Sequence, residues 1–304
     1  MFPEFLPATT TQLVDTSSVT LAQSYRREPT KTLGIPTGFV RQGEGRAPIV
    51  LLHGFDSSAI EFRRLLPLLA RERKTWAIDL LGFGFTNRDR APGFGPNWIC
   101  RHLHDVWQSW IGTPVILVGT SMGGSAALDF TLNHPECVEK LILMNSTGLV
   151  SGAPAIARWL FPPLDYWAAE FLRWPKLRQS VSERSYVDES LATEDALLCG
   201  SLHTTQPGWH RSIGAFTKAG GYGSVRDRLS DIRPPTLILW GKRDRILNPE
   251  DANIFHQAIP NSQLTWLDDC GHVRHLERPE TVAGCILEFA RYPSENHAVG
   301  VEKG

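Results

Sequence analysis

Short, fully apolar runs alternate with segments of helical periodicity along most of the chain. Such runs are typical of strands buried on both faces of a parallel sheet, whereas apolar positions spaced three to four residues apart indicate helices. A helix near 18–26 would be N-capped by Ser17 or Ser18. We predict strands over 33–42, 48–52, 75–80, 115–118, 138–144, 235–240 and 263–267, and helices over 18–26, 59–69, 97–111, 125–132, 249–258 and 279–292.

The alternation stops after residue 149 and resumes at residue 230. The intervening region is rich in Trp and Pro and has no strand periodicity. Strand–helix alternation elsewhere builds an α/β fold with a doubly wound, mostly parallel sheet. We therefore predict a core of residues 33–149 and 230–292, a helical cap of residues 150–229 inserted over the carboxyl edge of the sheet, an N-terminal extension of residues 1–32 and a C-terminal tail of residues 293–304.

The stretch from Pro114 to Gly124 contains the strongest chemical signal. It reads as strand, then Gly119-Thr120-Ser121-Met122-Gly123, then helix. This is the Gly-x-Ser-x-Gly nucleophile elbow, in which a sharp turn lifts a serine hydroxyl out of the sheet. Glycine is needed two residues before and after the serine because strand and helix nearly collide. The five-residue pattern alone arises by chance in about one chain in ten of this length. Assigning Ser121 as a nucleophile therefore also requires a base, an acid and a second oxyanion donor at the expected places in the chain.

A serine hydroxyl needs a base to take its proton and a third group to orient that base. The last two predicted strands each end in a candidate, because 235–240 leads into Asp244 and 263–267 leads into His272. Strand ends on one edge of a parallel sheet are where sites form. We therefore predict a catalytic triad of Ser121, Asp244 and His272.

The transition state also requires donors for a developing oxyanion. We expect these to be the Met122 N–H, at the start of the elbow helix, and the Phe55 N–H, in the loop after the strand 48–52. His53 would shape that loop, and His275 would support the site from one turn beyond His272.

Other residues are weaker candidates for these roles. Asp268 and Asp269 are closest to His272 in sequence, but either would have to strain to reach the far nitrogen of the ring. Asn145, after strand 138–144, carries an amide that cannot act as an acid. Cys270 is expected to be buried and to behave as a small apolar side chain.

Two features after strand 75–80 are also explained without catalysis. Asp79, at the end of this strand, is better explained as a structural cap. Gly82 and Gly84 lack the third glycine and the helix of a dinucleotide fingerprint.

The composition of the chain excludes several classes of protein. The 304 residues carry a net charge of −1, which does not favour nucleic acid. The five cysteines form no Cys-x-x-Cys pair, which indicates a reducing compartment and no zinc site. Residues 1–12 lack the features of a secretion signal, and no stretch is apolar enough to span a membrane. We expect a cytoplasmic or other intracellular protein that needs no cofactor or metal.

With these motifs, residues 35–290 resemble the α/β-hydrolase fold superfamily. The segments His53-Gly54-Phe55-Asp56-Ser57-Ser58, Glu61-Phe62-Arg63-Arg64, Thr75-Trp76-Ala77-Ile78-Asp79 and Gly220-Gly221-Tyr222 are similar to those of the chlorophyll dephytylase branch of cyanobacteria and chloroplasts. That branch carries Ser-Leu-Gly-Ala at the elbow, where this chain has Ser-Met-Gly-Gly. The resemblance implies hydrolysis of the phytyl ester of chlorophyll or pheophytin, with peripheral contact at a photosynthetic (thylakoid) membrane.

Other families with a similar fold suggest alternative activities for this chain. Ser121 separates the chain from haloalkane dehalogenases and epoxide hydrolases, whose nucleophile is an aspartate. Carbon–carbon bond hydrolases share the Ser-Met-Gly-Gly elbow but place Trp after the catalytic histidine, where this chain has Val273. Our leading hypothesis is a serine ester hydrolase that forms an acyl-enzyme. A general carboxylesterase or lipase, a carbon–carbon bond hydrolase and a non-catalytic binding protein follow in that order.

The predicted cap carries large apolar side chains, several at helical spacing. They suit a lipophilic ester, since each buried CH₂ group contributes about 0.8 kcal/mol. Packing of the cap on the sheet is an equally simple explanation for most of them. The predicted substrate-binding residues are Trp159, Phe161, Leu164, Trp167, Phe171 and Trp174.

Overall fold

The computed structural model describes residues 1–45, 47–150 and 164–291, with side chains from Tyr166 onward in the last range, and is built on one eight-stranded sheet. The strand order is β1-β2-β4-β3-β5-β6-β7-β8. β2 is antiparallel to both neighbours and the other pairs are parallel, so the predicted mostly parallel sheet is confirmed. The strands are β1 (Arg26–Pro29), β2 (Pro36–Gln42), β3 (Ile49–Leu52), β4 (Thr75–Ile78), β5 (Val115–Ser121), β6 (Val138–Ser146), β7 (Thr236–Gly241) and β8 (Ser262–Leu267).

Helices connect the strands and cover both faces of the sheet. The α-helices are α1 (Thr16–Gln23), α2 (Leu66–Leu69), α3 (Pro96–Val106), α4 (Met122–Asn133), α5 (Leu164–Leu172), α6 (Pro175–Ser185), α7 (Glu194–Ser201), α8 (Trp209–Lys218), α9 (Glu250–Ala258), α10 (Arg274–Glu277) and α11 (Pro279–Arg291). Shorter 3₁₀ segments are η1 (Ala8–Gln12), η2 (Ala59–Phe62), η4 (Pro135–Cys137), η6 (Glu189–Leu191), η7 (Leu202–Thr205) and η8 (Arg226–Asp231), and η3 (Trp107–Ile111) is a π-helical turn.

Successive side chains of the central strands enter two different cores. In β5, Leu117 packs with side chains of α3, α4 and α9, whereas Ile116 and Val118 pack with those of α1, α2 and α11. A strand with helices on both sides must be apolar at every position. This explains why β3 and β5 lack the hydrophobic–polar alternation of a half-exposed strand.

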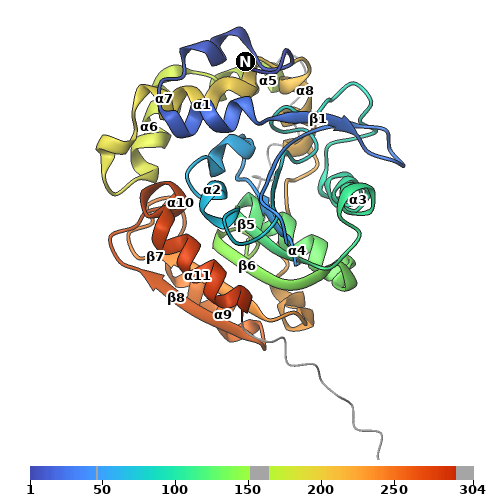
Figure 1. Cartoon of the computed structure of the whole chain (residues 1–304), viewed down its shortest axis with the longest axis vertical. Coiled ribbons are helices and arrows are strands. Elements are labelled where there is room, and N and C mark those ends of the chain that lie inside the picture. The colour runs from blue at the N-terminus through green and yellow to red at the C-terminus, as the bar shows by residue number, and fades with distance from the viewer. Residues whose placement is uncertain (46, 151–163, 292–304) are drawn as a thin grey trace, which may run out of the picture.

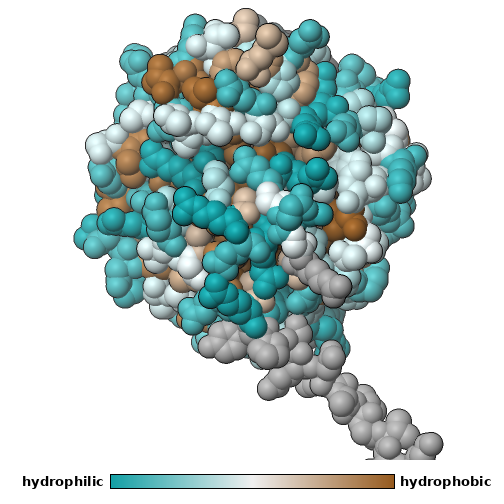
Figure 2. Space-filling model, in the orientation of Figure 1, coloured by the Kyte–Doolittle hydropathy of each residue, from teal (hydrophilic) through white to brown (hydrophobic). Residues whose placement is uncertain are grey.

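Helices α5 to α8 lie together at one end of the molecule, beside α1 (Figure 1). Asp195 of α7 joins this layer to the N-terminal segment, because its carboxylate accepts hydrogen bonds from the Val14 N–H (2.7 Å), the Asp15 N–H (3.0 Å) and the Ser18 hydroxyl (2.5 Å). The face seen in Figure 2 is mostly hydrophilic or intermediate in hydropathy, with hydrophobic colour only in separate areas.

Three local predictions need correction. The predicted helix 59–69 is two pieces, η2 and α2, separated by a turn, and Pro67 lies at the start of α2, where its missing N–H is tolerated. The N-cap of α1 is Asp15, whose carboxylate accepts from the Ser17 N–H. The region predicted as an N-terminal extension already contains β1, a short edge strand whose polar side chains gave no strand signal.

The junction between β5 and α4 is as tight as the elbow pattern predicted. Ser121 has φ 52° and ψ −122°, a strained conformation for a residue with a side chain. A Cβ at Gly119 would overlap the backbone of Gly123, and a Cβ at Gly123 would overlap the Leu52 carbonyl at the end of β3. Gly124 is restricted as well, because a Cβ there would overlap the Ser146 side chain.

We expect Gly123→Ala to lower the free energy of unfolding by about 3 kcal/mol or more, because a backbone carbonyl cannot move aside. Thermal or urea denaturation would measure the loss. Gly284→Ala is the matched control, since a Cβ at this exposed position in α11 meets nothing within 4 Å and should stabilise the helix by up to about 1 kcal/mol. Equal stability of the Gly123 variant and the wild type would contradict the steric account.

Candidate active site

Ser121 lies at the turn from β5 into α4, beside the loop that follows β3. A Cβ placed on Gly54 of that loop would be 3.5 Å from the Ser121 Cβ. Phe55 follows Gly54, and Met122 follows Ser121 as the first residue of α4. The two predicted oxyanion donors therefore belong to backbone segments that meet at the serine, one of them at a helix N-terminus.

The structure brings together His272 and Asp244, the residues predicted as base and acid. His272 Nδ1 lies 2.9 Å from Asp244 Oδ2, and both side chains are buried. Because a carboxylate only accepts, Nδ1 carries the proton and Nε2 remains free to accept one. Burial alone would raise the pKa of Asp244, but the interaction with His272 and the N–H groups of Ile246 and Leu247 hold it below its usual value.

Asn145, at the end of β6, holds Asp244 in place, a role that the sequence analysis did not predict when it rejected this residue as the acid. Its amide nitrogen donates to Asp244 Oδ2 (2.6 Å) and to the Gly271 carbonyl (3.2 Å), while its Oδ1 accepts from the Gly241 N–H (3.0 Å). One side chain thus joins the ends of β6 and β7 to the loop that carries His272. A polar residue at a buried strand end was the available signal.

The two carboxylates nearest to His272 in sequence do not reach it. Asp268 pairs with Lys242 (2.7 Å) and Asp269 with Arg243 (3.4 Å), with all four side chains more than half exposed. Cys270 is buried, and burial raises the pKa of its thiol to about 11, so the thiol is uncharged at neutral pH.

Two buried histidines support the loop that follows β3 and carries Gly54 and Phe55. We call it the oxyanion loop, after the role predicted for Phe55. His53 Nε2 accepts from the Leu80 N–H (3.1 Å), so its Nδ1 donates to the Gly54 carbonyl (2.8 Å), and burial lowers the pKa of His53 to about 4. His275 Nε2 lies 3.1 Å from Glu61 Oε1, and Glu61 Oε2 accepts from the Gly54 N–H (3.1 Å). Burial opposes ionisation of Glu61, yet the nearby His275 imidazole brings the pKa of Glu61 to about 2.

Asp79 has the structural role predicted for it. Its carboxylate accepts from the Tyr25 hydroxyl (2.9 Å) and from the N–H groups of Ala59 and Phe85 (both 2.7 Å).

Asp56 connects the oxyanion loop to the cap and was also missed from the sequence. Its Oδ1 accepts from His203 Nε2 (2.9 Å) and Trp209 Nε1 (2.8 Å), and its Oδ2 pairs with Arg178. Burial would raise the pKa of Asp56, but these three partners lower it to about 2.

A cavity of about 370 Å³ contains both Ser121 and His272. The oxyanion loop and η2 form one side, and α5, α6 and α7 of the cap form the other. Most side chains in its wall are apolar, among them Ile60, Leu172, Leu177, Val181, Leu197, Ile246, Val273 and Leu276. Water would be largely displaced by an apolar substrate in such a space.

Of the predicted substrate-binding residues, the three whose side chains are described do not line this cavity. Trp159 and Phe161 lie outside the described residues, and the side chain of Leu164 is not among those described. Trp167, Phe171 and Trp174 have exposed fractions of 64%, 55% and 50% and are absent from the cavity wall, which α5 reaches through Leu172 instead. The helical spacing did not identify the face of α5 that looks toward Ser121, and Trp174 lies beyond α5 as the N-cap of α6.

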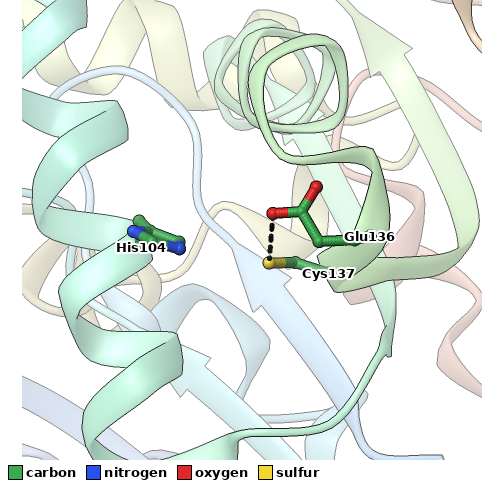
Figure 3. Close-up of side chains that lie close together, drawn as sticks. All are labelled: His104, Glu136 and Cys137. Atoms are coloured by element: carbon green, nitrogen blue, oxygen red, sulfur yellow. Dashed lines mark hydrogen bonds between the residues drawn. The ribbon is translucent and has the colours of Figure 1, made fainter.

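One group of potential metal ligands occurs within the described part of the chain, away from this site. His104, Glu136 and Cys137 have ligand atoms within 4.8 Å of one another, next to the amino end of β6 (Figure 3). Burial raises the pKa of Cys137 to about 12, its Sγ donates to Glu136 (3.6 Å), and the His104 ring stacks on His134. Without an ion, the three side chains are held by these contacts with one another and with His134.

The whole fold has counterparts among known proteins. A model described as "Alpha/beta hydrolase family" matches residues 49–284. Alpha/beta hydrolase domain-containing protein VTE7 of Arabidopsis thaliana is 32% identical over 300 residues, covering 95% of this chain and 90% of that protein. The 2-hydroxy-6-oxo-2,4-heptadienoate hydrolase of Pseudomonas putida is 30% identical over 270 residues, covering 84% and 93%.

Solved structures agree in fold. The serine hydrolase CarC, involved in carbazole degradation, superposes with a TM-score of 0.72 at 25% identity and covers 88% of this chain and 98% of that one. The 2-hydroxy-6-oxo-6-phenylhexa-2,4-dienoate hydrolase of Rhodococcus has a TM-score of 0.74 at 22% identity, with the same coverage.

We expect Ser121→Ala to reduce turnover by about 10⁶-fold, because the attacking oxygen is lost. Steady-state kinetics with an activated ester would measure the effect. Cys270→Ala, which removes a buried thiol near the base, is the control and should retain activity. A fully active Ser121→Ala enzyme would rule out the serine mechanism.

We expect Asp244→Asn to lower kcat by about 10⁴-fold while the protein stays folded, because an amide in place of the carboxylate favours the wrong imidazole tautomer. Asp268→Asn and Asp269→Asn are matched controls, as each changes an exposed ion pair. A greater loss in either control than in Asp244→Asn would show that the acid is assigned incorrectly.

Proposed function

Because the chain belongs to the alpha/beta hydrolase family, we propose that it is a serine hydrolase that cleaves a lipophilic carboxylic ester through an acyl-enzyme. The observation that carries this proposal is the hydrogen bond between Asp244 and His272 beside a cavity that also contains Ser121. A strained serine at a helix N-terminus supports it, since this arrangement suits a nucleophile and the anion formed by its attack.

In the proposed reaction, His272 Nε2 takes the proton as the Ser121 oxygen attacks the ester carbonyl. Asp244 stabilises the resulting imidazolium and keeps Nε2 directed away from itself. The N–H groups of Phe55 and Met122 bind the oxyanion of the tetrahedral intermediate. The intermediate then releases the alcohol, which takes the proton from His272. Attack of water, activated by the same base, frees the acid and restores the serine.

The apolar cavity wall supports a lipophilic substrate. We propose phytyl esters of the chlorophyll or pheophytin type as the first class to test, because of the dephytylase-like segments around Phe55, Glu61 and Tyr222. A cavity of about 370 Å³ is at the small end for ligand sites, so a long isoprenoid chain would extend beyond it.

Peripheral contact with a membrane is part of this proposal. No helix in the described ranges is long and apolar enough to cross a bilayer. Trp167, Phe171 and Trp174 are exposed near one another on the cap, and Val181 is half exposed while also bordering the cavity. Exposed aromatic side chains suit the boundary between lipid headgroups and acyl chains, so this region could receive a lipid-dissolved ester.

Carbon–carbon bond hydrolysis is the second candidate. It is favoured by the similarity to the Pseudomonas putida hydrolase and by the Ser121-Met122-Gly123-Gly124 elbow. The small Val273 at the cavity wall, next to His272, is the feature that weighs against it.

We expect kcat/KM for 4-nitrophenyl esters to rise as the acyl chain lengthens from two carbons to about eight, by up to about fourfold per added CH₂ group. The same preparation should release phytol from pheophytin in detergent, with Ser121→Ala as the control. Brisk hydrolysis of acetate and butyrate esters with no phytol release would leave a general carboxylesterase.

Faster turnover of 2-hydroxy-6-oxo-2,4-heptadienoate than of any ester would favour the carbon–carbon candidate. Failure of a fluorophosphonate probe to label Ser121 would point to a non-catalytic binding protein.

A further inference from the structure

Arg63 is a buried cation in the wall of the cavity that contains Ser121 and His272. It directly follows η2, and only 5% of its surface is exposed. A buried guanidinium is strongly unfavourable unless an anion and hydrogen-bond acceptors compensate it. Its surroundings therefore decide whether its charge is satisfied within the protein.

Four ionised side chains line the cavity, and three of them are compensated. Asp56 and Arg178 form an ion pair with each other. Glu61 accepts the Gly54 N–H and lies 3.1 Å from His275 Nε2. Arg63 differs, because no carboxylate of the described residues lies within 4.0 Å of it. Its Nε is buried without a hydrogen-bond partner, as is the Nε of Arg178.

The nearest acidic groups do not neutralise Arg63. The phenol of Tyr186 and the thiol of Cys199 lie close enough to interact with it and share the same cavity wall. Burial raises the pKa of both groups, so both are uncharged at neutral pH. Asp195 attracts Arg63 from farther away, and its oxygens are already occupied by Val14, Asp15 and Ser18.

We propose that Arg63 binds a carboxylate of the substrate, so that the natural ester has an apolar body and a separate negatively charged group. A guanidinium presents paired N–H donors that match the two oxygens of a carboxylate, and the Tyr186 hydroxyl adds a neighbouring donor. This proposal rests on the proposed ester hydrolysis and narrows its substrate class. A phytyl ester without a free carboxyl group would leave Arg63 unpaired.

The test compares two substrates that differ only in charge: the mono-4-nitrophenyl ester of adipic acid and its methyl-capped diester. In a second pair of esters, the alcohol part carries the carboxyl group, either free or as its methyl ester. Comparing the two pairs shows whether the acyl part or the alcohol part of the ester contacts Arg63. For at least one pair we expect wild-type kcat/KM to be about tenfold to 100-fold higher for the charged ester.

Arg63→Gln should reduce this ratio to near one, and Arg63→Lys should retain part of it. Arg71→Gln is the matched control, because Arg71 is exposed on the segment that follows α2. A ratio near one in the wild type, or a ratio unchanged by Arg63→Gln, would overturn the proposal while ester hydrolysis stands.

A binding measurement separates this proposal from catalysis. Calorimetry with decanoate and the uncharged decanamide on the Ser121→Ala protein should show tighter binding of decanoate by about tenfold or more. Adding Arg63→Gln should abolish the difference, and Arg63→Lys serves if the glutamine variant does not fold. If no ester is hydrolysed but this difference is seen, the ester proposal fails and the anion site remains. Equal binding of the two ligands by Ser121→Ala protein would refute the anion site.

Discussion

The close approach of α4 to the ends of β5 and β3 is the constraint on which the rest of the site depends. It forces Ser121 to φ 52° and excludes a Cβ at Gly119 and Gly123. The same geometry raises the serine hydroxyl toward the cavity, places the Met122 amide at a helix N-terminus and brings Gly54 beside the nucleophile. The strain at one residue is maintained by two buried cores, since β5 contributes alternate side chains to both.

Asp244, the proposed catalytic acid, depends on a second kind of support, which is polar. Asp244 is buried and ionised because it has several donors: the His272 ring, the Asn145 amide and the N–H groups of Ile246 and Leu247. Asn145 also spans the ends of β6 and β7. Buried polar networks stabilise a unique geometry only when every member is satisfied. An error in strand register at this edge would therefore disrupt the base–acid pair before it affected the apolar cores.

The sequence predicted the parts of the site that follow from strand ends and missed those that depend on packing between distant segments. Ser121 ends β5, and Asp244 and His272 follow β7 and β8, so parallel strand order was enough to bring them to one edge. Nothing local to Asn145 or Asp56 reveals that one joins strand ends and the other binds the cap. The prediction for Trp167, Phe171 and Trp174 was wrong for a related reason. The helical period that grouped them could not determine which face of α5 is buried, nor that the helix ends before Trp174. β1 was missed because an edge strand can be polar on both faces.

The attachment of the cap gives the cavity its electrostatic character. Asp56 follows the proposed oxyanion donor Phe55 and is bound by Arg178, His203 and Trp209 of the cap, so the cap and the oxyanion loop are held as one unit. Moving the cap away would separate a buried carboxylate whose pKa of about 2 depends on those partners. Asp56 neutralises the charge of Arg178 in this attachment, whereas no carboxylate of the described residues pairs with Arg63. Specificity in this cavity would then arise from Arg63, the one charge among the described residues of its wall that has no opposite charge beside it, and not from the size of the cap.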